Sequence, residues 1–270
     1  MSPRRPEPPA ESSQTGARLA ARDVTLAVGR RTLIAGLELE FSPGEIWCIV
    51  GPNGAGKTTL ISTLAGLQPP TQGAIELDGR PLSGWPSSEL ALRRALMPQA
   101  VRDAFSASVF EAVLLGRHPY LAGWGWEQPT DRAAAVDALA ALGLTELAAR
   151  DILSLSGGER QRVALAAALC QDAPLMLLDE PLAHLDLHHQ IDCLKLLVQR
   201  AAAGCTVIFS CHDLNLARRY ASHALLLDGA GATDAGPVRD VLSADNASRA
   251  FAYPLILIES AGHEALVPAH

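Results

Sequence analysis

The chain has 270 residues, of which 49% are hydrophobic and 19% charged, so it is long enough and apolar enough to bury a sizeable α/β core. Its formal net charge of −7 argues against broad, sequence-independent binding of nucleic acid, which needs a basic surface. Its longest apolar runs, such as residues 254–258, fall well short of a membrane span, and the N-terminus lacks the apolar core of a signal peptide.

The first residues differ in composition from the rest of the chain. Residues 1–17 are rich in proline, serine and charge and have no periodicity, so we expect a disordered leader that carries no chemistry. Short β-like runs follow at residues 19–28, 33–41 and 74–77. Arg30 and Arg31 are expected to form a turn between the first two runs. Together these runs predict a small antiparallel layer.

A glycine-rich turn lies between an apolar run, residues 46–50, and a helix-like run that ends at Gly66. Its pattern is G-x-x-x-x-G-K-T, in which successive backbone N–H groups can surround a pyrophosphate. Lys57 can then reach the outer phosphates, and the Thr58 hydroxyl can bind magnesium. An ordinary βα turn is the alternative, but it does not account for the complete pattern. The predicted phosphate-binding residues are Gly51, Pro52, Asn53, Gly54, Ala55, Gly56, Lys57, Thr58 and Thr59.

The middle of the chain changes in character after a buried strand predicted at residues 94–99. Helical spacing follows at residues 109–115, 130–142 and 144–153. We therefore expect a helical subdomain at about residues 100–170, inserted into the sheet domain. The aromatic loop from Tyr120 to Trp126 is either an exposed contact loop or a local cap on these helices, and the sequence leaves both open.

Two acidic residues, Asp179 and Glu180, follow an apolar strand predicted at residues 175–178. In a parallel α/β sheet, ligands gather at the carboxyl ends of strands, so both acids should face the same phosphates as Lys57. We expect Asp179 to hold magnesium and Glu180 to polarise the attacking water. A strand-end turn or a helix cap is the alternative for these acids.

Ser156 and Glu159 have the spacing of a helix capping box, with Gly157 and Gly158 between them. A helix that begins in this way presents free N–H groups and a positive dipole end, which makes a second anion site. This second site has no lysine or magnesium ligands of its own. The economical interpretation is that it binds the nucleotide held by another copy of the chain.

These motifs resemble the nucleotide-binding subunits of ATP-binding cassette transporters over residues 18–255. Residues 51–59 match the Walker A motif of that family, residues 175–180 match Walker B, and residues 155–159 match the signature motif. Gln99, Asp186 and His212 match the Q-loop glutamine, the D-loop aspartate and the switch histidine.

The resemblance implies a fold, a set of cofactors and an assembly. The fold is a P-loop NTPase, a RecA-like parallel sheet with an antiparallel β layer and an inserted helical subdomain; residues 256–270 form a C-terminal tail. ATP and magnesium are the implied cofactors, and the copies form a head-to-tail homodimer. The implied catalytic residues are Glu180, His212 and Gln99. The implied magnesium ligands are Thr58, Gln99 and Asp179. The resemblance also implies that ATP contacts Ser156, Gly157, Gly158 and Asp186.

The sequence also resembles a particular kind of transporter. Residues 109–120 and 185–190 are similar to subunits of bacterial importers of iron–siderophore, haem or cobalamin. This similarity implies docking on separate transmembrane permease chains at the cytoplasmic face of the inner membrane, with a periplasmic substrate-binding protein as an indirect partner. An exporter subunit is the nearest alternative, and a soluble cassette ATPase is a more distant one.

Two positions depart from the family pattern. Family members commonly place an aromatic residue that stacks on adenine where this chain has Val28-Gly29, and the D-loop carries His184 where a small residue is usual. His188 and His189 do not predict a metal site, because adjacent positions do not share a helix face. The five cysteines lie mostly in or beside apolar runs without a C-x-x-C pair, so we expect buried free thiols in a reducing compartment.

Overall fold

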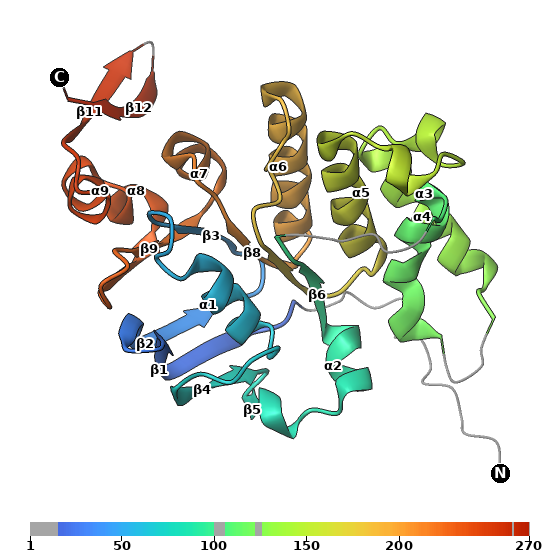
Figure 1. The fold of residues 1–270 in the computed structure, drawn as a ribbon, viewed down its shortest axis with the longest axis horizontal. Coiled ribbons are helices and arrows are strands. Elements are labelled where there is room, and N and C mark those ends of the chain that lie inside the picture. The colour runs from blue at the N-terminus through green and yellow to red at the C-terminus, as the bar shows by residue number, and fades with distance from the viewer. Residues whose placement is uncertain (1–15, 100–105, 122–125, 261, 270) are drawn as a thin grey trace.

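The computed structural model describes residues 16–99, 106–121, 126–260 and 262–269 (Figure 1). The predicted disordered leader lies almost wholly outside the described residues, as does Trp124 of the aromatic loop. Within the described part, two sheets lie in separate layers, with helices packed on them and a short hairpin at the C-terminal end (Figure 1).

The larger sheet is the core of the molecule, with the order β10-β9-β3-β8-β7-β6. The strands pair in parallel except for β10, which is antiparallel to β9 at the edge. The fold class predicted from the sequence is therefore confirmed. The strands are β3 (Ile46–Val50), β6 (Arg94–Met97), β7 (Leu175–Leu178), β8 (Thr206–Ser210), β9 (His223–Leu227) and β10 (Thr233–Pro237).

The continuous apolar runs are explained by two cores, one on each face of this sheet. On β3, Cys48 and Val50 point into the core shared with the outer helices, whereas Trp47 and Ile49 point into the core shared with the second sheet. Successive strand residues face opposite sides, so a strand covered on both faces must be apolar at every position. All residues of β3, β7 and β8 are buried.

The second sheet is antiparallel, with the order β2-β1-β4-β5. It covers α1 (Lys57–Leu64), whose apolar residues lie in the core between the two sheets. The predicted turn was only half right: Gly29, at φ +60°, and Arg30 form it, while Arg31 already pairs with Val28. The strands are β1 (Leu19–Val28), β2 (Arg31–Phe41), β4 (Gln72–Leu77) and β5 (Arg80–Pro81).

Helices surround the larger sheet, with α6 and α7 over one face and α3, α4 and α5 gathered at one end (Figure 1). The helices besides α1 are α2 (Ser87–Arg93), α3 (Val109–Leu114), α4 (Pro129–Ala141), α5 (Gly157–Cys170), α6 (Leu187–Ala202), α7 (Leu214–Tyr220), α8 (Val238–Val241) and α9 (Ala244–Phe251). Short 3₁₀ turns occupy Leu82–Gly84, Leu115–Tyr120, Thr145–Leu147 and Ile152–Ser154.

The helix predicted at residues 144–153 is wrong, because this segment contains only two of those 3₁₀ turns. Within the segment the backbone forms only i to i−3 bonds, such as Leu147 N to Leu144 O, and it also bonds to residues at the start of α3. Val109 N donates to Arg150 O at 2.9 Å, and Ile152 N donates to Ala107 O at 2.9 Å. The apolar spacing was helical, but these tertiary hydrogen bonds decided the backbone conformation. The chain limits predicted for the helical subdomain remain a prediction.

The predicted C-terminal tail forms a hairpin of β11 (Leu255–Ser260) and β12 (His263–Pro268). The Asn215 side chain, on α7, attaches this hairpin to the body of the protein. Its Oδ1 accepts from Leu266 N at 2.8 Å, and its Nδ2 donates to Leu266 O at 3.2 Å.

Candidate nucleotide-binding site

The glycine-rich turn is closely packed at two of its glycines. A Cβ atom at Gly51 would lie 2.5 Å from Leu227 O, and one at Gly56 would lie 3.1 Å from Leu33 Cβ. Gly56 has φ +104°, a conformation that glycine adopts at little cost, and α1 begins directly after it. The backbone of the turn can therefore approach an anion at the start of this helix.

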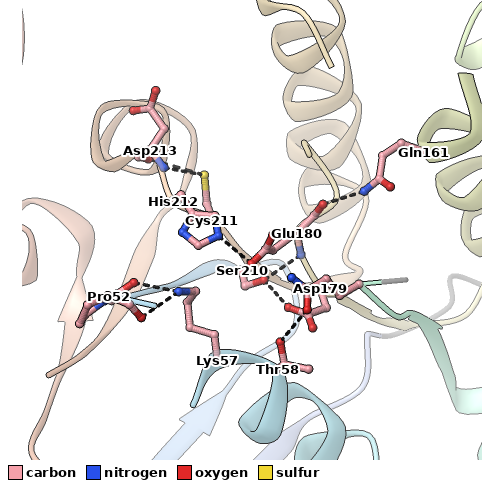
Figure 2. Close-up of polar contacts among 12 residues, drawn as sticks. Pro52, Lys57, Thr58, Gln161, Asp179, Glu180, Ser210, Cys211, His212 and Asp213 are labelled. Atoms are coloured by element: carbon pink, nitrogen blue, oxygen red, sulfur yellow. Dashed lines mark hydrogen bonds and ion pairs between the residues drawn. The ribbon is translucent and has the colours of Figure 1, made fainter. Parts of the chain in front are cut away.

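Lys57 is buried and lies across its own turn. Its Nζ donates to Gly51 O at 2.8 Å and to Pro52 O at 3.2 Å (Figure 2). Burial lowers the pKa of Lys57 from its ordinary value, while the charges of Glu180 and Asp179 act in the opposite direction. A cation held in this way beside a glycine-rich turn is suited to bind phosphate oxygens.

The first acid after β7, Asp179, is only 1% exposed. Its Oδ1 accepts a hydrogen bond from Ser210 Oγ at 2.6 Å, whereas its buried Oδ2 has no hydrogen-bond partner among the described residues. Nearby, Thr58 Oγ1 donates to Gln99 Oε1 at 3.5 Å. A carboxylate, a hydroxyl and an amide oxygen are hard ligands of the kind that magnesium prefers, so these residues fit that ion.

Glu180 is held from three sides. Its N–H donates to Ser210 Oγ at 2.8 Å, its carbonyl accepts from Gln161 Nε2 at 2.7 Å, and its Oε1 lies 2.6 Å from His212 Nε2 (Figure 2). Its φ of +52° is unusual for a residue with a side chain, and these contacts hold it there. Asp213 caps α7 directly after His212.

One cavity of about 680 Å³ joins most of the predicted residues, which is enough room for a nucleotide. β1 and β2 contribute Val28, Arg31 and Leu33 to its lining. Its lining residues are Val28, Arg31, Leu33, Asn53, Gly54, Gly56, Lys57, Thr58, Thr59, Gln99, Glu180 and His212. Gly51, Pro52, Ala55 and Asp179 are next to this lining rather than part of it.

The signature residues and Asp186 lie outside this cavity. The predicted capping box is present: Ser156 Oγ accepts from Glu159 N at 3.3 Å, and Glu159 Oε2 accepts from Ser156 N at 2.7 Å. A Cβ atom at Gly158 would lie 2.9 Å from His184 O, so the signature turn packs against the D-loop backbone, where His184 has φ +62°. Asp186 caps α6 by accepting from His189 N.

Sequence reasoning missed Ser210, Gln161, Arg31 and Leu33. The first two position Glu180, and the other two line the cavity. Ser210 could have been found, because it is a small polar residue at the carboxyl end of a strand that is otherwise apolar. The sequence offers no comparable signal for the other three.

The predicted aromatic loop folds back in part. The Arg117 guanidinium lies 3.7 Å from the centre of the Tyr120 ring, and its Nε donates to Asp131 Oδ1 at 3.0 Å. Tyr120 therefore belongs to a local cap, whereas Trp126 is 88% exposed. The cysteines are all buried free thiols.

A glycine-rich phosphate turn between a buried parallel strand and a helix, with acids at the end of a nearby strand, defines a P-loop nucleoside triphosphatase. Residues 34–183 match the family model described as ABC transporter. The chain belongs to this family, and it is an ATP-hydrolysing subunit of the transporter type.

Two relatives match nearly the whole chain. The hemin import ATP-binding protein HmuV of Streptomyces coelicolor is 41% identical, with 94% of this chain and 90% of the relative covered. The ferric enterobactin transport ATP-binding protein FepC of Escherichia coli K12 is 36% identical, with 95% and 96% covered.

Solved structures agree with this assignment. A metal-chelate type ABC transporter in an inward-facing conformation superimposes with a TM-score of 0.81 at 30% identity, covering 94% of this chain and 98% of that chain. The ATP-binding cassette MJ0796, solved as a dimer with ADP and Pi, gives a TM-score of 0.72 at 25% identity, with 82% of this chain and 99% of that chain covered.

In the described part of this chain, no helix combines the length and apolar character needed to cross a bilayer.

Proposed function

We propose that this protein is the ATP-hydrolysing subunit of a bacterial importer that takes up haem or an iron–siderophore complex. The observation that carries the proposal is the match of two relatives, named for hemin import and for ferric enterobactin transport, over 94% and 95% of this chain. Neither of these relatives is named for cobalamin, so cobalamin is left out of the proposal. The subunit docks on separate permease chains at the cytoplasmic face of the membrane.

The proposed chemistry is attack of water on the γ-phosphorus of ATP, which releases ADP and phosphate. Glu180 accepts the proton of the attacking water, and its carboxylate is oriented by His212. Lys57 binds the outer phosphate oxygens. Magnesium would be held by Thr58, Gln99 and Asp179, and when bound it neutralises charge on the phosphates. The unpartnered Oδ2 of Asp179 supports this assignment.

The proposed assembly is a head-to-tail homodimer. Ser156, Gly157 and Gly158 form the start of a 14-residue helix with anion-binding character, yet they do not line the cavity of their own subunit. In the dimer they complete the nucleotide site of the partner subunit, with Asp186 beside them. The MJ0796 cassette, which is dimeric with ADP and Pi bound, supports the dimer.

A second cavity suits the permease. It has a volume of about 300 Å³ and lies between β6, α3 and α5, with a mainly apolar lining that includes Met97, Pro98 and Val163. Pro98 is followed directly by Gln99, which lines the nucleotide cavity. A permease segment bound in this cavity would therefore contact Pro98, the immediate neighbour in sequence of a residue that lines the nucleotide cavity.

The test is reconstitution of this subunit in vesicles with the permease encoded beside it. A periplasmic binding protein loaded with haem or a ferric siderophore should stimulate ATP hydrolysis inside the complex and drive uptake, whereas the unloaded binding protein should not. A complex that contains the Glu180→Gln variant is the matched control, because it should assemble without sustained turnover. Export of substrate, or stimulation by neither class of chelate, would contradict the proposal.

A further inference from the structure

The nucleotide cavity has one end without an assigned function. Among its lining residues, Glu180, His212 and Gln99 are assigned above to the attacking water and magnesium, and Lys57 to the outer phosphates. The lining residues without an assigned role include Val28 and Arg31 of the β1–β2 hairpin, and these are left to contact the base. Val28 is 60% exposed and offers only a small apolar surface for a base.

Arg31 is an exposed side chain whose guanidinium is nevertheless fixed in place. Its Nη2 donates to Gly229 O at 2.8 Å and its Nε donates to the same oxygen at 3.3 Å. These two hydrogen bonds to Gly229 O use one edge of the planar guanidinium, and they do not cover either of its faces. Across the described residues, Arg31 makes no ion pair with a carboxylate.

The turn that holds Arg31 is itself packed against the phosphate turn. Gly229 has φ +74°, and a Cβ atom there would lie 3.1 Å from Ala55 Cα and 3.2 Å from Arg31 Nη2. A Cβ atom at Gly54 would lie 3.9 Å from Arg31 Nη1. The guanidinium is therefore held by a turn that packs on the phosphate turn, and it lies close to Gly54 in the lining of the nucleotide cavity.

We propose that the adenine of the bound nucleotide stacks on the guanidinium plane of Arg31, with Val28 in contact at its edge. Guanidinium groups stack on aromatic and base rings, and a group already fixed by Gly229 O loses little conformational entropy when it does so. The inference rests on the nucleotide site proposed above, and it makes Arg31 the residue that binds the base in this chain.

The experiment compares two ligands that differ only by the nucleoside and are not hydrolysed. Kd values for Mg-ADP and Mg-pyrophosphate are measured by calorimetry on the full chain. Loss of base stacking should weaken ADP binding by roughly 5- to 150-fold in Arg31→Ala, because a stacked base contributes about 1–3 kcal/mol. Pyrophosphate binding should change less than about twofold. The Arg30→Ala variant, at the exposed neighbouring position, is the matched control and should bind both ligands as the wild type does.

Two further variants keep the test decisive if Arg31→Ala folds poorly. Arg31→Lys keeps the charge but not the plane, and should lose ADP affinity nearly as Arg31→Ala does; Arg31→Tyr restores a flat ring and should recover it. Equal weakening of ADP and pyrophosphate would assign Arg31 to the phosphates and overturn the inference, as would unchanged ADP binding in Arg31→Ala. Failure of the wild type to bind Mg-ADP would instead overturn the proposed nucleotide site.

Discussion

Ser210 is the residue on which the positions of both acids depend, and Ser210→Ala tests this directly. The hydroxyl donates to Asp179 Oδ1 at 2.6 Å and accepts from Glu180 N at 2.8 Å, and the residue is fully buried. The substitution removes both bonds and leaves almost no cavity. Asp179 would then have neither carboxylate oxygen hydrogen-bonded within the described part of the chain.

The expected cost follows from these two contacts. Leaving a buried polar group unpaired costs about 1–3 kcal/mol, and more when the group is charged, so the loss should be about 3 kcal/mol of unfolding free energy. In a domain of this size, each kcal/mol lowers Tm by roughly 2–4 °C, which gives an expected decrease of roughly 6–12 °C.

Thermal unfolding followed by circular dichroism, without nucleotide, measures this decrease. Ser87→Ala is the matched control, because Ser87 is exposed at the start of α2 and should change Tm by little. A decrease below about 2 °C in Ser210→Ala would mean that water replaces the hydroxyl, and the reasoning about these two hydrogen bonds would be refuted.

Three further outcomes are expected. Glu180→Gln should bind ATP normally but release phosphate about 10²- to 10⁴-fold more slowly, since a general base is lost, and unchanged steady-state hydrolysis would exclude this role. Ser156→Arg should bind nucleotide as a monomer yet fail to dimerise with ATP; dimers that persist in light scattering would rule out the shared site. The N–H of Ser156 holds the pKa of Glu159 below its ordinary value of 4.5. The stability conferred by this hydrogen bond is therefore fully present above pH 4.5 and is lost as the pH falls through the lower pKa of the folded state. The Tm difference between wild type and Glu159→Gln should therefore vanish at low pH, and a difference that grows on acidification would contradict the capping-box assignment.

Much of the fold could be predicted because it depends on residue types in sequence order. A strand buried on both faces must be apolar throughout, as at Ile46–Val50, and a backbone that approaches phosphate needs glycine at Gly51 and Gly56. The acids Asp179 and Glu180 could be assigned to the same edge of the sheet, since parallel strands end together.

The rest depends on contacts between distant segments. The spacing of residues 144–153 is helical, yet hydrogen bonds to the segment before α3 override it. Gln161 reaches Glu180 O from another element, and Arg31 reaches Gly229 O, which is 198 residues away in sequence. Neither contact has a local sequence pattern, so only the folded structure reveals them.

The bond between Gln161 and Glu180 has a consequence for how two copies would work together (Figure 2). Gln161 is on α5, and that helix begins at the turn proposed to receive the other subunit's nucleotide. In the proposed dimer, a ligand bound at the start of α5 would therefore act on the carbonyl of Glu180, beside the nucleotide cavity of its own subunit. Such coupling of the two pockets should make ATP turnover by the assembled transporter rise more steeply than linearly with nucleotide concentration.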